Sequence, residues 1–224
     1  MNKHLVAVFA HPDDEAFGPS GSLLMETAAG TSLHLILLTA GEAGINHSGG
    51  DLSRLRLDEW QQSAKRLGAT SRHFLGYQDG RLTNQDMQQI SQKIIELIQQ
   101  QTIEAEEIEL MSFEFGGISG HIDHIVAARA TAAAFYKLKS ADNRLTRLRL
   151  FCLPESISSQ PNTDWIFVDK GYAENQIDQV VDARHLIPQI NAVIDAHASQ
   201  SQDAAYVRRL YGEYFGLNWF VVMS

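Results

Sequence analysis

The segment LVAVFAHPDDE, residues 5–15, determines how the rest of the chain is interpreted. Its first six residues, Leu5–Ala10, form an apolar run that suits a short buried β-strand and is far too short to span a membrane. Three carboxylates follow, and no small-residue cleavage site separates them from the run, so the segment is not typical of a signal peptide. The sequence therefore predicts a first strand that ends at a cluster of ionisable side chains.

Short apolar runs alternate with longer amphipathic stretches along the remaining sequence. The predicted strands are Leu5–Ala10, Leu33–Thr39, Arg72–Leu75, Ile108–Phe113, Leu148–Leu153 and Trp165–Val168. The predicted helices are Gly21–Ala29, Leu52–Leu67, Asp86–Gln100, His121–Lys139, Ile187–Ala198 and Asp203–Gly212, before a last apolar run from Phe215 to Met223. This alternation predicts an α/β fold, a single domain over residues 1–224 with a mostly parallel sheet and helices on both faces.

The composition limits the classes of partner. Lys and Arg total 18 against 27 Asp and Glu, a formal charge of −9, whereas nucleic acids and anionic membranes require a basic surface. The single cysteine, Cys152, excludes an intramolecular disulfide, and no run approaches the length of an integral membrane segment. We expect a cytoplasmic protein that does not bind nucleic acid. The oligomeric state is left open, with a homo-oligomer among the alternatives.

Ionisable side chains follow the first and the fourth predicted strands. HPDDE, residues 11–15, comes directly after the first strand, and HIDH, residues 121–124, comes shortly after the fourth. Because open α/β sheets bind ligands outside the carboxyl ends of their strands, we expect these two segments to lie close together. A dinucleotide site would have glycines after the first strand, whereas the acids found here repel phosphate and attract a cation.

Two histidines and a carboxylate, with positions left open for water and substrate, are typical of a catalytic metal centre. The candidates are His11, Asp14, His121 and His124. Zn²⁺ is the expected ion, and Fe²⁺ suits the same arrangement. His121 and His124 share a face of a helix at this spacing, so one can bind metal while the other faces the substrate. A second carboxylate, Asp13 or Glu15, is what a hydrolase needs to deprotonate water.

Simpler interpretations compete with a metal site. Taken alone, HPDDE is also typical of an acidic helix N-terminus, and HIDH of a solvated helix start. The occurrence of both at strand ends, each before a predicted helix, favours the metal site. The remaining histidines lack this context and are expected to be structural or surface residues: His4, His34, His47, His73 and His185.

These motifs resemble those of the PIG-L/LmbE-like de-N-acetylase family. The similar segments are AHPDDE (10–15), RLDE (56–59), LGYQDGRL (75–82), GISGHIDH (117–124) and AHASQ (196–200). The resemblance covers about residues 5–200. It implies a Rossmann-like fold, a zinc site and hydrolysis of an N-acetyl group, usually on an N-acetylglucosamine unit of a small glycoconjugate.

The resemblance also implies roles for single residues. His11, Asp14 and His124 resemble the metal ligands. Asp13 is similar to the general base, and His121 to the acid that also faces the oxyanion. The chemistry supports separate roles for the two adjacent acids, because a carboxylate bound to a cation has a depressed pKa and is a poor proton acceptor.

Two further positions complete the expected site. Asp123 is similar to a residue that orients His121, and Arg56 to a substrate-binding arginine. Ser119 stands where some family members have a tyrosine, so an oxyanion contact from a phenol is not expected here. The sequence thus predicts a metal-dependent hydrolase that acts on a small N-acetylated amino sugar or conjugate. Two alternatives stay open: an amidase for another small amide conjugate, and a non-catalytic sugar- or metal-binding module.

Overall fold

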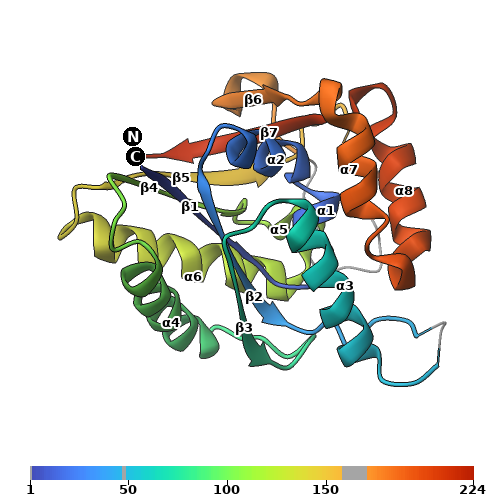
Figure 1. Cartoon of the computed structure of the whole chain (residues 1–224), viewed down its shortest axis with the longest axis horizontal. Helices are drawn as coiled ribbons and strands as arrows, with labels where there is room; N and C mark the ends of the chain where they lie inside the picture. Colours follow the sequence, from blue (N-terminus) through green and yellow to red (C-terminus); the bar gives the residue numbers. More distant parts are fainter. Residues whose placement is uncertain (1, 47–48, 158–170) are drawn as a thin grey trace.

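The middle one of the parallel strands is β1, residues Lys3–Phe9, as the computed structural model shows (Figure 1). The structure describes residues 2–46, 49–157 and 171–224. All of β1 after Lys3 is buried, as expected of an apolar strand that is covered on both faces. β1 pairs in parallel with β2 (Ser32–Thr39) on one side and with β4 (Glu107–Phe113) on the other.

Seven strands form one sheet in the order β3-β2-β1-β4-β5-β7-β6. The remaining strands are β3 Ser71–Tyr77, β5 Leu145–Cys152, β6 Gln179–Asp182 and β7 Leu217–Met223. The five strands from β3 to β5 in this order run parallel, whereas β7 is antiparallel to both β5 and β6. The predicted α/β class and mostly parallel sheet are confirmed.

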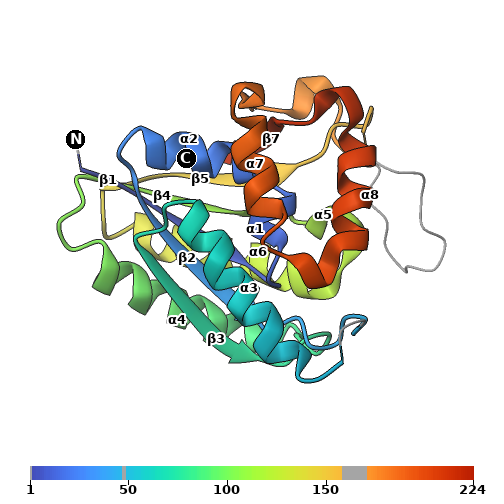
Figure 2. The ribbon, with the colours of Figure 1, turned by 45° about the vertical axis from the view of Figure 1, so that its right-hand side comes forward.

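Helices cover both faces of the sheet (Figures 1 and 2). They are α1 Asp14–Phe17, α2 Ser20–Ala28, α3 Leu52–Arg66, α4 Asp86–Gln101, α5 Gly117–Gly120, α6 Ile122–Lys139, α7 Ile187–Ile194 and α8 Ser201–Tyr211. On one face, α4 and α6 pack their apolar side chains, among them Ile94 and Val126, against the sheet. On the other face, α2, α3 and α7 contribute Leu23, Trp60 and Ile190 to a second apolar cluster. None of the described helices is long and apolar enough to cross a membrane.

The structure differs from the predicted elements where an element is short. β6 spans four half-exposed residues, so it has no apolar run that would reveal it. α1 and α5 are single turns, too short to show a helical period. The last apolar run is strand β7. The predicted strand Trp165–Val168 and His47 lie outside the described residues.

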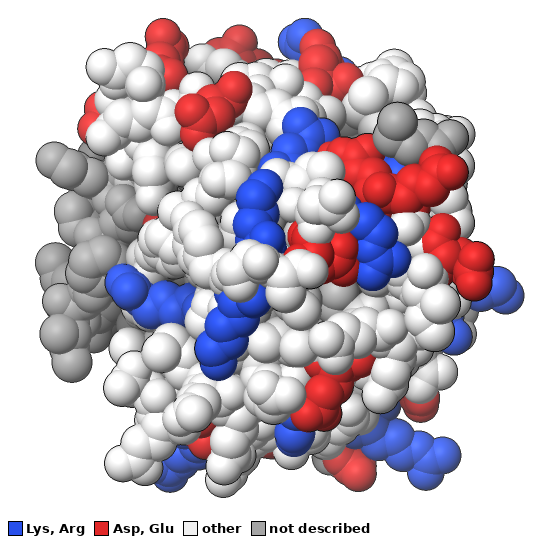
Figure 3. Space-filling view, turned by 90° about the vertical axis from the view of Figure 1, so that its left-hand side faces the viewer, with Lys and Arg blue, Asp and Glu red and all other residues white. Residues whose placement is uncertain are grey.

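The order of the strands places the predicted site residues at the carboxyl ends of the inner strands β1 and β4. From β1 the chain proceeds outward to β2 and β3 and then returns to form β4 on the other side of β1. Ligands bind at such a switch point, outside the carboxyl ends of the strands. The side where the chain begins and ends, to the left in Figure 1, instead mixes Lys and Arg with Asp and Glu side chains (Figure 3).

Candidate metal centre and active site

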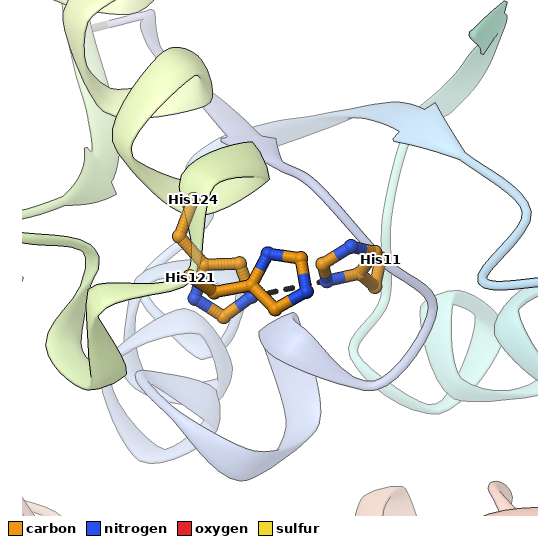
Figure 4. Close-up of side chains that lie close together, drawn as sticks. All are labelled: His11, His121 and His124. Atoms are coloured by element: carbon orange, nitrogen blue, oxygen red, sulfur yellow. Dashed lines mark hydrogen bonds between the residues drawn. The ribbon is translucent and has the colours of Figure 1, made fainter. Parts of the chain in front are cut away.

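Three histidines converge at the carboxyl ends of β1 and β4 (Figure 4). His11 follows β1, whereas His121 and His124 lie at the start of α6. His11 Nδ1 is 3.0 Å from His124 Nε2, and the His121 ring centroid is 4.6 Å from that of His11. The other ring nitrogen of His124 lies 3.1 Å from the Gly117 carbonyl oxygen, to which it can donate. That bond leaves the Nε2 lone pair of His124 directed at His11.

The carboxylate of Asp14 completes this group. Its Oδ1 lies 3.3 Å from His124 Nε2, and its Oδ2 lies 3.9 Å from His11 Nδ1. Oδ2 also accepts hydrogen bonds from the backbone N–H groups of Ala10 and His11, at 3.0 and 2.9 Å. Burial alone would raise the pKa of Asp14, but the charges of His124 and His11 hold that pKa well below its ordinary range. Asp14 is therefore a fixed anion facing two imidazoles.

The donor set fits a transition metal. Zn²⁺ binds imidazole nitrogen at about 2.0–2.1 Å in tetrahedral geometry, which separates neighbouring ligand atoms by about 3.3 Å. The nitrogen pair at 3.0 Å and the oxygen–nitrogen pair at 3.3 Å are close to this spacing. Two imidazole nitrogens at this distance need a proton or a cation between them, because their lone pairs repel. The sequence-predicted ligands thus lie together, and their role in metal binding stays a prediction.

A second acidic group surrounds the other side of His11. The Nε2 atom of His11 lies 3.0 Å from Asp79 Oδ1 and 3.4 Å from Asp123 Oδ2. Burial lowers the pKa of His11, but hydrogen bonds with Asp123 and Asp79 outweigh it and raise the pKa to about 10. These three residues are one of two described groups that could hold a metal ion, the other being His11 with His121 and His124. The carboxylates around His11 therefore favour a positive charge at this position.

Asp123 contacts His121 through its main chain. The backbone N–H of Asp123 donates to His121 Nδ1 at 3.2 Å, whereas the Asp123 carboxylate lies beside His11 and accepts two backbone N–H groups from the loop after β3. The sequence-derived role of Asp123 in orienting His121 stays a prediction. Burial, together with the charges of His124 and His11, lowers the pKa of His121 to about 4.

Asp13 and Arg56 form a buried ion pair. Arg56 Nη2 lies 2.7 Å from Asp13 Oδ2, and the guanidinium also donates to the carbonyl oxygens of Gly41 and Pro12. Asp13 has φ 111°, which is uncommon for a residue other than glycine and marks local strain. Burial raises the pKa of Asp13 to about 7, although the charge of Arg56 opposes this rise. Arg56 is thus inside the site, and its contact with substrate stays a prediction.

Glu15 lies behind the site and contacts the late AHASQ segment. Its Oε1 accepts hydrogen bonds from Ser63 Oγ and from His197 Nε2, the latter at 2.8 Å. Its Oε2 accepts the backbone N–H of Asp13 at 3.3 Å. Glu15 is fully buried, whereas Asp13 lines an open cavity, so Asp13 is the better placed of the two candidate bases.

Residues of this centre line two cavities. The polar cavity has a volume of about 340 Å³ and is lined by His11, Asp13, Arg56, Asp79 and His121, among others. The other cavity, about 220 Å³, reaches Asp14 and His124. Asp79 was not among the site residues predicted from the sequence, although its place shortly after β3 within LGYQDGRL was the signal that could have found it.

Known proteins share this sequence pattern. Residues 6–135 match the family described as PIG-L, GlcNAc-PI de-N-acetylase. A 1D-myo-inositol 2-acetamido-2-deoxy-alpha-D-glucopyranoside deacetylase of Salinispora arenicola is 29% identical over 160 residues, which cover 60% of this chain and 51% of that protein. The match thus spans about half the length of this relative.

Solved structures share the fold at lower identity. The N,N'-diacetylchitobiose deacetylase of Pyrococcus horikoshii has a TM-score of 0.70 and 16% identity, with 99% of this chain and 84% of that chain covered. The 4-carboxy-2-hydroxymuconate hydratase of Pseudomonas putida has a TM-score of 0.67 and 17% identity, with 99% and 96% covered. Because one is a deacetylase and the other a hydratase, the fold leaves the reaction to be argued from the site.

Proposed function

The chain is a member of the PIG-L (GlcNAc-PI de-N-acetylase) family, and we propose that it is a metal-dependent amide hydrolase. The proposed substrate is an N-acetylglucosamine-type unit of a small molecule, from which the N-acetyl group is removed. One observation carries the proposal. His11, Asp14 and His124 meet at one point, while Asp13 and His121 line the polar cavity that adjoins it.

The metal would be held by His11 Nδ1, Asp14 Oδ1 and His124 Nε2. Zn²⁺ is the proposed ion, with Fe²⁺ as the alternative. When bound, such an ion acts as a Lewis acid toward an acyl oxygen and makes water more acidic. The protein supplies the orientation of the ligands, because backbone groups fix both Asp14 and His124.

Asp13 is the proposed general base. Its carboxylate lines the cavity that water and substrate enter, and Arg56 holds it in place at 2.7 Å. Since Asp14 faces the two imidazoles and Asp13 faces Arg56, the adjacent acids have separate tasks. Asp13 removes a proton from the attacking water, whose oxygen then bonds to the acyl carbon.

His121 is the proposed acid. Because its Nδ1 accepts the Asp123 backbone N–H, the proton of the ring is carried by Nε2. Burial, together with the charges of His124 and His11, lowers the pKa of His121 and favours this neutral ring. The Nε2–H group of His121 donates to the oxyanion and then gives its proton to the leaving amine as the C–N bond breaks, and the proton that Asp13 took from the water replaces it.

The two alternatives predicted from the sequence are an amidase and a binding module. An amidase for another conjugate would use the same residues with a different amine. A non-catalytic binding module has no need of Asp13 and His121 beside three ligands. The cytoplasmic location, a homo-oligomeric state and the lack of a nucleic-acid partner stay predictions of the sequence.

The test measures acetate, primary amine and metal together. Purified protein would be incubated with N-acetylglucosamine, N,N'-diacetylchitobiose and an N-acetylglucosaminyl inositol, with metal content determined by mass spectrometry. We expect equal amounts of acetate and amine, loss of both on chelation, and recovery with Zn²⁺.

Two histidine variants control this test. His124→Ala should lose both metal and activity, because two ligands hold a metal poorly. The exposed His185→Ala should keep both. Metal-loaded protein that releases no acetate from any of these amides would refute the hydrolase.

A further inference from the structure

The second cavity beside the proposed metal centre is mostly apolar. It has a volume of about 220 Å³, and Asp14 and His124 form part of its wall. The rest of the wall consists largely of aromatic and aliphatic side chains, among them Phe17, Phe113, Phe151, Leu153, Val207 and Leu210. A hydrocarbon-lined cavity in contact with two proposed metal ligands is suited to an apolar part of the substrate.

Helix α8 borders both cavities. Gln202 and Asp203, in its first turn, line the polar cavity, whereas Tyr206, Val207 and Leu210 line the apolar one. The polar cavity thus adjoins His11 and His121, whereas the apolar cavity adjoins Asp14 and His124. Tyr206 is 47% exposed, so the apolar cavity opens to solvent along α8.

The wall beside the metal centre is held in a strained conformation. Ile118 has φ 64° and ψ −58°, a backbone region that β-branched residues rarely adopt. The Glu114 carboxylate maintains it by accepting the backbone N–H of Ile118 at 2.6 Å and that of Gly116 at 2.5 Å. The Phe113 ring stacks on His124, with centroids 4.4 Å apart. Strain that the surroundings maintain in this way is typical of ligand sites.

We propose that this cavity binds the alkyl chain of the substrate's acyl group, so that the enzyme hydrolyses N-acyl amines with chains longer than acetyl. This inference rests on the proposed function. In an amide, the nitrogen and the alkyl group are both bonded to the carbonyl carbon and point away from each other. The nitrogen must lie beside His121, which lines the polar cavity, so the alkyl group is directed toward the cavity of Asp14 and His124.

The size of the cavity favours a chain of several carbons. At about 30 Å³ per water-sized group, 220 Å³ holds about seven such groups, whereas the methyl of an acetyl group fills about one. The reaction is an ordinary hydrolysis. Water adds to the acyl carbon, the C–N bond breaks, the amine leaves with a proton and the acyl group leaves as a carboxylate.

The first experiment is a chain-length series. Amine release would be measured for N-acetyl-, N-butanoyl-, N-hexanoyl- and N-octanoylglucosamine at subsaturating concentration. Each methylene that enters the cavity should raise kcat/KM by about two- to fourfold until the cavity is full. An octyl glycoside of N-acetylglucosamine serves as a comparison in which the chain is on the sugar.

Variants of α8 test whether the dependence of kcat/KM on chain length arises in the apolar cavity. Val207→Phe places a large ring in the apolar cavity and should lower the ratio of hexanoyl to acetyl kcat/KM at least tenfold. Ala205→Phe is the matched control, because Ala205 is an exposed residue of the same helix and lines neither cavity. The control should leave the ratio of hexanoyl to acetyl activity unchanged.

Calorimetric titration with free alkanoates gives a readout independent of turnover. Hexanoate should bind the metal-loaded protein more tightly than acetate, and Val207→Phe should abolish the difference. Hexanoyl activity far below acetyl activity, or a gain confined to the octyl glycoside, would refute the acyl-chain site and leave the proposed function intact. No amine release from any substrate would instead refute the proposed function itself.

Discussion

At the scale of single residues, the adjacent carboxylates of Asp13 and Asp14 have different partners. Asp14 faces His124 at 3.3 Å, whereas Asp13 faces Arg56 at 2.7 Å. Asp13→Asn should therefore keep the metal and slow hydrolysis by about 10²–10⁴-fold, the usual contribution of a positioned base. Asp14→Ala should lose the metal. Metal stoichiometry and rate, measured for both variants together, check this. If Asp13→Asn lost the metal while Asp14→Ala kept it, the roles of ligand and base would have to be reversed.

Gly41 leaves room for the Arg56 guanidinium. It has φ +67°, and a Cβ added there would lie 2.4 Å from Arg56 Cζ. Gly41→Ala should displace Arg56 from Asp13 and lower the hydrolysis rate at least tenfold while the metal is retained. Gly49→Ala is the control for backbone strain, since Gly49 has φ +72° and open space around it. That variant should lose about 1 kcal/mol of stability and keep its rate. Equal rate losses in both variants would exclude the contact with Arg56 as the cause.

At the scale of secondary structure, the sequence was informative where a signal is local. The apolar run of β1 and the HPDDE motif are continuous, so both the strand and the site residues after it could be predicted. β6 could not, because its four residues have no apolar run. The bond between Glu15 and His197 joins residues 182 positions apart, and no local pattern encodes such a pairing.

The amino ends of β1, β2 and β3 contain a second histidine group, away from the proposed metal centre. His34 Nε2 lies 3.0 Å from His4 Nδ1, and His34 Nδ1 lies 2.8 Å from Ser71 Oγ. Burial, then the charges of His4 and His73, lower the pKa of His34 from 6.5 to about 4. The folded state therefore disfavours protonation. The stability linked to His34 is present above about pH 6.5 and is lost as the pH falls toward 4.

Urea unfolding at pH 7.5 and pH 5 tests this dependence. Wild-type protein should lose more stability between these pH values than His34→Gln, in which the titrating group is absent. His185→Gln, at an exposed position, should behave like wild type. The same loss in wild type and His34→Gln would show that other groups cause the pH dependence.

At the scale of the whole molecule, the proposed metal connects β1 to α6. A ligand that binds only the folded state stabilises it by about 4 kcal/mol at a thousandfold excess over Kd. For a chain of 224 residues this corresponds to a rise in Tm of about 8–16 °C. Scanning calorimetry with Zn²⁺ and with a chelator should show a rise of this order in wild type and little in His124→Ala. A rise of the same size in the variant would place the stabilising ion elsewhere.

The pairing of β1 with β4 also brings together the ligands of the proposed metal centre. His11 and His124 are 113 positions apart in the sequence, and β2, α3, β3 and α4 are all made between them. A partly folded chain that contains only the first three strands has His11 and Asp14 but lacks His124. Binding through all three ligands therefore requires that this long connection is closed first. We expect a metal that binds only when all three ligands have met to act chiefly by slowing unfolding, with a smaller effect on the rate of folding.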